Sequence, residues 1–134
     1  MRRREFLMLS GAAAAAPLGL AQSDAAPAAE GEKKMYGLIG KITAVAGRRE
    51  ALAAILLEGT RAMPGCLSYI VAADPADPDA LWITEVWDSR ESHEASLKLP
   101  AVQAAIAKGR PLIAGFSNRV ETVPIGGYGL EQAR

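Results

Sequence analysis

The sequence predicts an α+β domain in which a four-stranded antiparallel sheet carries two helical regions on one face. Two observations support this prediction. Stretches of β-rich, alternating apolar residues and stretches of helical periodicity follow one another in the order β-α-β-β-α-β, which is the ferredoxin-like arrangement. Half of the 134 residues are hydrophobic, so the chain is long enough and apolar enough for one packed domain.

Residues 1–34 are predicted to be a signal peptide and linker that do not belong to the fold. The stretch RREFL at 3–7 resembles the twin-arginine export motif, and a weakly apolar run follows at 6–21. Gly19-Leu20-Ala21 is a candidate cleavage site. The run of about 16 residues is short for the ~20 that a membrane-spanning helix needs. We therefore expect export to the periplasm or the exterior without a stable membrane anchor, in preference to an uncleaved anchor.

The folded domain is expected over residues 35–124, and it begins with a strand and a helix. Met35–Ala46 alternates loosely and is β-rich at its centre, which predicts the first strand. Gly47 separates this strand from Arg48–Met63, whose apolar residues recur with helical spacing and which Pro64-Gly65 ends. The predicted apolar face of this helix consists of Leu52, Ile55 and Leu56.

A β-hairpin is predicted next. Cys66–Asp74 and Leu81–Asp88 have the composition of strands. The two Asp-Pro pairs within 74–80 exclude regular structure between them. Because this connection is short, the two strands should pair with each other in antiparallel fashion.

A helical region and a final strand complete the domain. Asp88 precedes Glu91 by three residues, which predicts a capping box with Asp88 as the N-cap. Pro100 is expected to open a second helical segment that ends near Gly109. The last strand is predicted at Ser117–Pro124.

Both faces of the predicted sheet are apolar. On the first strand Tyr36, Leu38 and Ile42 oppose Met35, Ile39 and Val45, and on the third Leu81 and Ile83 oppose Trp82 and Val86. The helices can cover only one face, so we expect a second copy to cover the other and to form a dimeric α+β barrel. The alternative is that the loose tail at 125–134 folds over this face.

Composition and motifs exclude several classes of function. Lys and Arg number 15 and Asp and Glu number 15, a balance unlike the basic patch of a nucleic-acid-binding protein. One cysteine and one histidine cannot supply the four ligands of a structural zinc site. The chain has no glycine-rich dinucleotide motif, no Walker loop and no G-x-S-x-G. No metal and no cofactor is therefore predicted, and an enzyme built on this chain is expected to work without one.

His93 is the only histidine and the first candidate for chemistry. It follows Trp87 by six residues, one turn into the helix expected after the third strand. An imidazole with a reference pKa of about 6.5 can act as a base near neutral pH. The alternative is a solvated helix residue flanked by Glu91 and Glu94.

Aromatic and charged residues on the strands are the other candidates. Trp87 and Trp82 are an odd number of residues apart, so they should face opposite sides of the sheet. Glu85 shares the face of Trp87, and a carboxylate at mid-strand needs a partner, for which Arg119 is a candidate. Tyr69 can either donate a hydrogen bond into a cavity or pack with its hydroxyl at the rim.

The stretch MPGCLSYIVAADPADPDALWITEVWDSRESHEASLKLPAVQAAI, at 63–106, resembles the antibiotic biosynthesis monooxygenase domain family, which includes quinol monooxygenases. The resemblance extends over 35–123 and is carried by Pro64-Gly65-Cys66, Tyr69, the Asp-Pro turn, Glu85-x-Trp87, Ser89 and His93. It implies a ferredoxin-like chain that dimerises through its sheets into an α+β barrel.

The resemblance also implies an enzyme that oxidises a small quinol- or phenol-type aromatic with dioxygen, without metal or flavin. A base would help to form an electron-rich, phenolate-like anion that itself reduces dioxygen in an apolar cavity. On this basis His93 is the base or a hydrogen-bond partner, and Trp87 and Tyr69 line or polarise the pocket. The residues expected to contact the substrate are Glu85, Leu38, Ile83 and Arg119.

Two departures from the family pattern qualify these expectations. Ser96 stands where many quinol-oxidising relatives carry a histidine in an A-H-L-x-S-P context. No histidine lies between Pro100 and Phe116, the region in which haem-degrading relatives bind iron, so haem is not predicted. Two other hypotheses stay open: a non-catalytic dimeric module that binds a small hydrophobic ligand, and a dimeric scaffold with a closed barrel interior.

Overall fold

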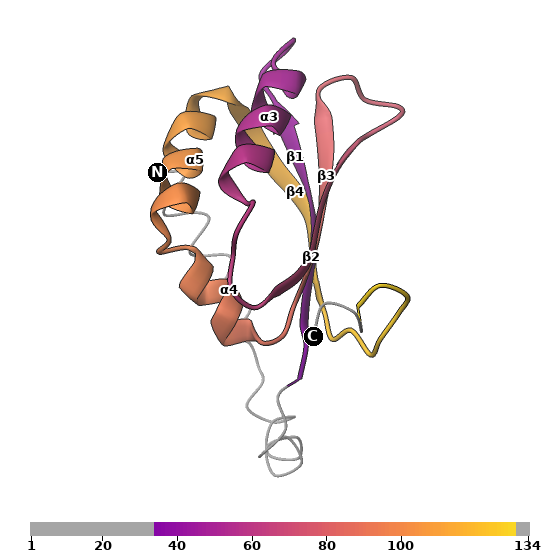
Figure 1. The fold of residues 1–134 in the computed structure, drawn as a ribbon. Helices are drawn as coiled ribbons and strands as arrows, with labels where there is room; N and C mark the ends of the chain where they lie inside the picture. Colours follow the sequence, from indigo (N-terminus) through magenta and orange to yellow (C-terminus); the bar gives the residue numbers. More distant parts are fainter. Residues whose placement is uncertain (1–33, 131–134) are drawn as a thin grey trace, which may run out of the picture. The chain divides into compact units, whose positions relative to one another are not determined.

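Strands and helices alternate along residues 34–130, the part of the chain that this computed structural model describes (Figure 1). The elements are β1 (Tyr36–Ala44), α3 (Arg49–Gly59), β2 (Cys66–Ala73), β3 (Ala80–Trp87), α4 (Arg90–Ser96), α5 (Pro100–Gly109), the 3₁₀ turn η1 (Arg110–Leu112) and β4 (Ile113–Thr122). The predicted βαββαβ order is confirmed, and Pro100 divides the second helical region as expected. The predicted signal peptide lies outside the described residues. Among residues 34–130, no helix combines the length and the apolar composition that crossing a membrane requires.

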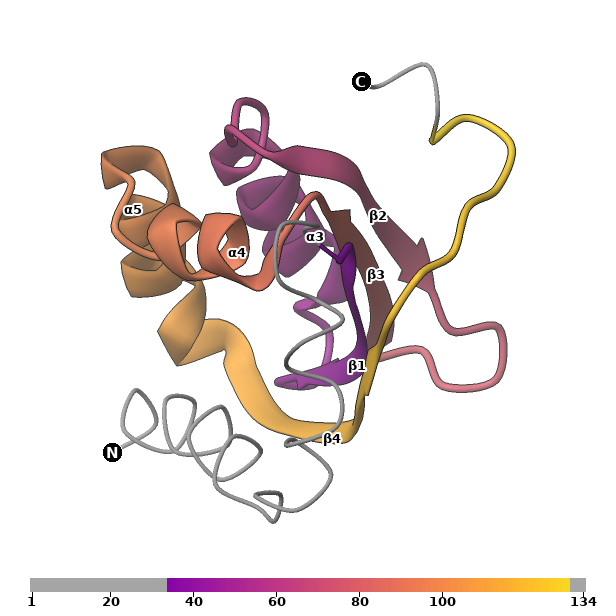
Figure 2. The same cartoon turned by 90° about the horizontal axis from the view of Figure 1, so that it is seen from below.

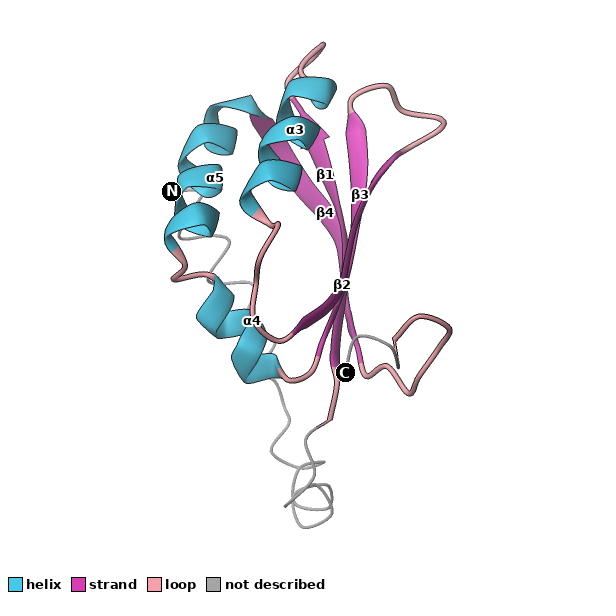
Figure 3. Ribbon diagram, in the orientation of Figure 1, coloured by secondary structure: helices cyan, strands magenta, loops and turns pink. Residues whose placement is uncertain are grey.

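The strands form one antiparallel sheet in the order β2-β3-β1-β4. The central strand β1 pairs with β3 on one side and β4 on the other, and the predicted hairpin joins β2 to β3. The helices lie on one face of this sheet, as Figures 2 and 3 show. The α+β, ferredoxin-like fold class is therefore confirmed.

Asp74 organises the turn of the hairpin. Its Oδ1 accepts hydrogen bonds from the backbone N–H groups of Ala76 and Asp77, at 2.7 and 3.1 Å, and its Oδ2 accepts one from Trp82 Nε1 at 2.9 Å. The Asp-Pro sequence that excludes regular structure here also supplies the acceptor that builds the turn.

The strand register arranges the candidate residues in two rows on the helix-covered face. Directly opposed residues of antiparallel strands point to the same face of a sheet. The first row consists of Cys66, Trp87 and Tyr36, and the second consists of Tyr69, Glu85, Leu38 and Glu121. Trp87 is 1 % exposed under the helices, whereas Trp82 faces the opposite side, as predicted.

The apolar core lies between the sheet and α3. Its buried cluster comprises Ala44, Leu52, Leu81 and Ile83. Leu52 is fully enclosed and Leu56 packs against this cluster, so the predicted helix face is confirmed at both residues. Replacing a fully buried leucine such as Leu52 with alanine costs about 2–5 kcal/mol.

The helix α3 ends at Gly59, earlier than the predicted Met63. Thr60 Oγ1 donates a hydrogen bond to the carbonyl of Leu56 at 2.7 Å and so satisfies one of the free carbonyls at the helix end. A Cβ on Gly59 would overlap the side chain of Ala105, because α3 and α5 approach each other closely at this point. The close approach explains why a glycine stands there.

The N-cap of α4 is Ser89, and the predicted cap at Asp88 is wrong. Ser89 has an extended backbone, and its Oγ accepts a hydrogen bond from the N–H of Ser92 at 3.2 Å. Asp88 directly follows β3, and its N–H donates to the carbonyl of Gly65 at 2.8 Å. Its carboxylate instead accepts a hydrogen bond from the Ser92 hydroxyl at 2.6 Å.

The strand β4 begins at Ile113, earlier than the predicted Ser117, and it ends at Thr122. Pro111 lies inside the 3₁₀ turn η1, which takes up the interruption that a proline imposes on a helix. The chain therefore enters the sheet directly after this turn.

The outer face of the sheet, opposite the helices, carries exposed apolar side chains. One row of opposed residues on this face is Ile70, Thr84, Ile39 and Val120. Ile70 and Val120 are 52 % and 50 % exposed. Ile125 and Tyr128 in the tail are 95 % and 100 % exposed, so the tail as far as residue 130 does not cover this face.

Substitution of Gly65 tests how tightly α4 is seated on the sheet. Gly65 has φ +86, and a Cβ there would overlap the side chain of Ser92 on α4. We expect Gly65→Ala to lower the free energy of unfolding by about 2–4 kcal/mol, from left-handed strain and overlap together. Gly47→Ala is the matched control, because Gly47 has φ +78 in open space, and it should cost about 1–2 kcal/mol. If denaturant unfolding shows the same loss of unfolding free energy in both variants, α4 does not pack closely against Gly65.

Candidate active site

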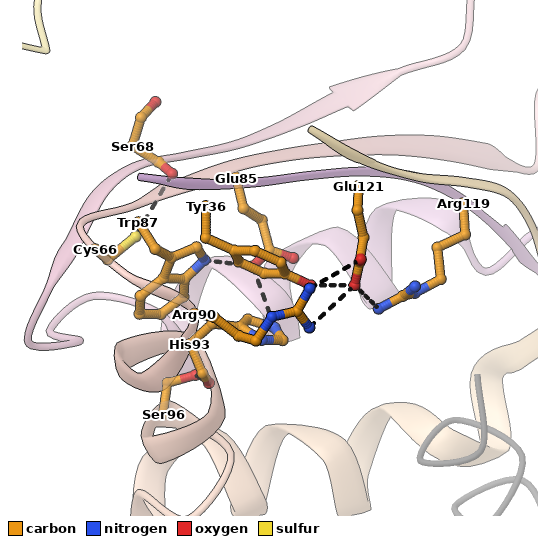
Figure 4. A network of polar contacts seen from close by, with 10 residues as sticks. All are labelled: Tyr36, Cys66, Ser68, Glu85, Trp87, Arg90, His93, Ser96, Arg119 and Glu121. Atoms are coloured by element: carbon orange, nitrogen blue, oxygen red, sulfur yellow. Dashed lines mark hydrogen bonds and ion pairs between the residues drawn. The ribbon is translucent and has the colours of Figure 1, made fainter. Parts of the chain in front are cut away.

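His93 is buried on the sheet-facing side of α4. Its side chain is 9 % exposed, and its ring packs at 5.2 Å from the Tyr36 ring and edge-on at 5.4 Å from the Trp87 ring. The alternative of a solvated helix residue is therefore wrong. The connection between β3 and α4 is short, so the first turn of α4 lies over the sheet. His93 therefore packs against Trp87, which belongs to the first row (Figure 4).

The surroundings of His93 keep its imidazole neutral at pH 7. Burial lowers the pKa of His93 to about 4, and the positive charges of Arg119 and Arg90 act in the same direction. Nε2 lies 3.9 Å from Glu85 Oε1, within reach of an ion pair but longer than a hydrogen bond. Because burial disfavours the charged form of each group, we regard this contact as one between neutral imidazole and a carboxyl group.

Glu85 is the carboxyl group at the centre of the second row. It accepts a hydrogen bond from Trp87 Nε1 at 2.9 Å. Burial raises the pKa of Glu85, and this effect exceeds the opposing ones of the Trp87 hydrogen bond and the charge of Arg119. Glu85 is thus a desolvated carboxyl group between a tryptophan and a histidine.

A second carboxyl group, Glu121, is shared by three donors. It accepts from the Tyr36 hydroxyl at 2.7 Å and from two nitrogens of Arg90 at 3.1 and 3.4 Å. Arg119 donates to it at 3.5 Å. Burial alone would raise the pKa of Glu121, but the hydrogen bonds from Tyr36 and Arg90 outweigh it and lower the pKa. Glu121 is therefore an ionised carboxylate.

Tyr36 lies between His93 and Glu121 and contacts both. Together with Glu85, Trp87, Arg90 and Arg119, these residues are called the polar cluster. The Arg90 guanidinium lies 4.7 Å over the Tyr36 ring, a cation–π contact, while the other partners of the ring and hydroxyl are His93 and Glu121. Burial and the hydrogen bond to Glu121 raise the pKa of Tyr36 to about 12. The hydroxyl is therefore a hydrogen-bond donor that does not ionise near neutral pH.

The predicted site residues do not all lie in one place. His93, Trp87 and Glu85 are in direct contact, and Tyr69 lies opposite Glu85 on the neighbouring strand. Burial raises the pKa of Tyr69, so its hydroxyl stays protonated. Leu38 lies in the same row between the two carboxyl groups, whereas Ile83 belongs to the buried apolar core.

The pairing suggested between Arg119 and Glu85 is replaced by another one. Arg119 forms its ion pair with Glu121, its neighbour on the same strand face, and acts on Glu85 through its charge. Arg119 and Glu121 are two residues apart on β4, so both point to the helix-covered face.

Three members of the cluster, Tyr36, Arg90 and Glu121, were not predicted as site residues. A signal was present for two of them, because Tyr36 shares a strand face with Leu38 and Glu121 shares one with Arg119. No comparable signal existed for Arg90, whose place depends on how α4 meets the sheet.

Cys66, at the end of the first row, has a thiol whose pKa burial raises to about 11. It is therefore unreactive near neutral pH. Among residues 34–130, no group of three or more His, Cys, Asp or Glu side chains could hold a metal ion.

The antibiotic biosynthesis monooxygenase family model matches residues 35–108. This chain belongs to the antibiotic biosynthesis monooxygenase family. A crystal structure from Chloroflexus aurantiacus, named as a candidate antibiotic biosynthesis monooxygenase, is 69 % identical with a TM-score of 0.70, and the match covers 72 % of this chain and 98 % of that one. No curated protein matches the chain.

More distant crystal structures share the fold. A candidate family member from Caulobacter crescentus has a TM-score of 0.64 at 16 % identity, over 70 % of this chain and 92 % of that one. A protein from Pseudomonas aeruginosa has a TM-score of 0.62 at 23 % identity, over 70 % of this chain and 97 % of that one. At these identities the likeness concerns the fold alone.

The single histidine makes the ionisation of the site directly measurable by NMR. In untagged folded protein, the His93 resonances should titrate with a midpoint near pH 4, while urea-unfolded protein should titrate near the reference value of about 6.5. A folded midpoint at or above the unfolded one would contradict the burial of a neutral imidazole.

The same shift sets the direction of a stability change. Between about pH 6.5 and 4 the unfolded chain binds a proton on His93 that the folded chain does not bind, so acidification favours unfolding. The contribution of His93 to stability should be complete above pH 6.5 and decline toward pH 4. Denaturant unfolding of wild type and His93→Gln at several pH values measures it.

Proposed function

We propose that the protein is a cofactor-independent monooxygenase that oxidises a small aromatic substrate of the quinol or phenol type with dioxygen. The observation that carries this proposal is the buried, neutral His93 between the rings of Tyr36 and Trp87. Membership of the monooxygenase family supports the same reaction class. The specific substrate and the use of dioxygen are part of the proposal.

The proposed reaction requires only the substrate and dioxygen. His93 Nε2 takes the proton of an aromatic hydroxyl, so that the O–H bond breaks and its electron pair stays on oxygen. The resulting anion reduces dioxygen. One oxygen atom enters the ring and the other leaves as water, and the substrate supplies all the electrons. The rings of Trp87 and Tyr36 would keep bulk water from the reacting pair.

One property of the site favours a second candidate function, a non-catalytic module that binds a small hydrophobic ligand. A base with a pKa of about 4 is weak. Taking a proton from a phenol with a reference pKa of about 10 is then uphill by on the order of 8 kcal/mol, unless the anion is stabilised by its surroundings. A site without such stabilisation would bind an aromatic ligand and leave it unchanged.

Oxygen consumption distinguishes the two candidate functions. Chelator-treated protein should consume oxygen with at least one member of a panel of hydroquinones and polycyclic phenols. We expect His93→Ala and the larger His93→Gln to lower kcat/KM at least about a hundredfold, the usual contribution of a general base. Glu91→Gln, an exposed residue of the same helix, should leave it unchanged.

The pH dependence gives a further check on the base. With His93 in this role, the rate should hold from pH 8 to 5 and fall as the pH drops through about 4. No turnover on the whole panel would leave the binding module as the function. Unchanged turnover in His93→Gln would remove His93 from the mechanism.

We also propose that two copies pack through the outer face of the sheet, because Ile70 and Val120 leave this face apolar and open. Ile70→Lys should weaken the dimer at least about tenfold in sedimentation equilibrium, since it buries a charge at the interface. Leu57→Lys is the matched control: Leu57 is equally exposed, at 52 %, but lies on α3. A wild-type protein that is monomeric at every concentration would contradict the proposal.

A further inference from the structure

Gly40 lies on the helix-covered face of the central strand, and the space above it is open. It stands between Leu38 and Ile42 on β1, and the alternation of side chains places all three residues on that face. Its partner on β3 is Ile83, a member of the buried core. A Cβ on Gly40 would meet no atom of residues 34–130 within 4 Å, its chain neighbours aside. Gly40 therefore leaves a volume unfilled on the face that carries the polar cluster.

Neither backbone conformation nor crowding requires a glycine at this position. Gly40 does not have a positive φ, unlike Gly65. A Cβ on Gly37 or Gly59 would overlap a neighbouring side chain, whereas a Cβ on Gly40 would not. A glycine inside a strand destabilises the strand relative to a residue with a side chain. The physical effect of Gly40 that remains is the open space itself.

Apolar side chains continue from Gly40 along β1 and onto β4. Ile42 is partly buried and packs against the core. Phe116 on β4 opposes Ile42, so both point to the helix-covered face, and Phe116 is 41 % exposed. Leu38, on the other side of Gly40, is also partly buried. We call these four residues, Leu38, Gly40, Ile42 and Phe116, the apolar shelf.

The apolar shelf is continuous with the polar cluster. The register between β1 and β4 shifts beside Gly40, where Asn118 and Arg119 together oppose it in a β-bulge. Arg119 points from this bulge toward Glu121, with which it forms an ion pair (Figure 4). Leu38 opposes Glu121 in the second row. A molecule held at the polar cluster can therefore extend over Gly40 along the same face of the sheet.

We propose that the apolar shelf is a subsite for a hydrocarbon extension of the ligand, and that Gly40 limits the size of this extension. The extension is attached to the part of the ligand that the polar cluster holds. Gly40 and Ile42 are about 7 Å apart along the strand, which suits an alkyl chain of about five carbons. The inference rests on the proposed function only for placing the ring of the ligand at the polar cluster, and it requires no step of the oxidation.

The test uses a series of alkylhydroquinones, from methyl to pentyl, with the full chain. Their affinities are measured by equilibrium dialysis under nitrogen, so that oxidation cannot consume the probes. Affinity should rise about two- to fourfold with each added methylene, because each methylene that enters the shelf leaves water.

Matched glycine variants assign the rise to the shelf. Gly40→Val should lower the affinity for pentylhydroquinone at least about tenfold and leave that for methylhydroquinone nearly unchanged, because the valine occupies the space of the chain. Gly115→Val is the control. Gly115 is also a strand glycine with open space at its Cβ, but it opposes Thr43 on the outer face. Thermal unfolding and sedimentation verify that the variants compared are folded and have the same oligomeric state.

A smaller substitution decides the question if valine proves too large for the protein to fold. Gly40→Ala adds only the Cβ for which the space is open, so it should fold at least as stably as wild type. It should also lose the affinity gain of about one methylene. A loss of stability in Gly40→Ala would show that the space is not open and would overturn the inference.

The binding data overturn the inference in any of four ways. These are no binding of any probe, no rise of affinity with chain length in wild type, a rise that persists in folded Gly40→Val, and a rise that Gly115→Val removes as well. The proposed oxidation fails separately. A chain-length gain without oxygen consumption leaves this inference standing, and oxygen consumption without a chain-length gain leaves only the oxidation.

Discussion

The register of the central strand β1 is the constraint on which the rest of the site depends. Because β1 pairs on both sides, it sets Tyr36 opposite Trp87 and places Leu38 between Glu85 and Glu121. A slip of β1 by one residue would turn Tyr36 and Leu38 to the outer face, away from Trp87 and the two carboxyl groups. The helix α4 packs over this row. The connection from β3 to α4 is short and restricts where the helix can lie.

Two carboxyl groups in one row have opposite electrostatics because their neighbours differ. Within residues 34–130 the one hydrogen-bond donor to Glu85 is Trp87, and desolvation raises the pKa of this carboxyl group. Glu121 has two guanidinium groups and a tyrosine hydroxyl, and these offset its burial. The cluster therefore has an aromatic, weakly polar end and a cationic end.

Family membership and site chemistry are separate arguments for function. The family model and the close relative from Chloroflexus aurantiacus establish the fold and the class to which the chain belongs. A fold can carry many activities, so the reaction has to be argued from the cluster itself. In that cluster burial makes His93 a weak base, and the positive charges of Arg119 and Arg90 lower its pKa further.

The sequence by itself determined the order of elements, the two faces of the sheet, and the placing of Glu85 on the same face as Trp87 and opposite to Trp82, because side-chain alternation and turn chemistry are local properties. Its errors were local too, at Asp88 and at the start of β4, where a neighbouring hydrogen bond or a 3₁₀ turn decided the boundary. Only the tertiary structure decided that His93 is buried, that Arg119 pairs with Glu121, and that Arg90 lies over Tyr36. These facts depend on strand register and on the seating of α4, and both are set by contacts between residues far apart in the chain.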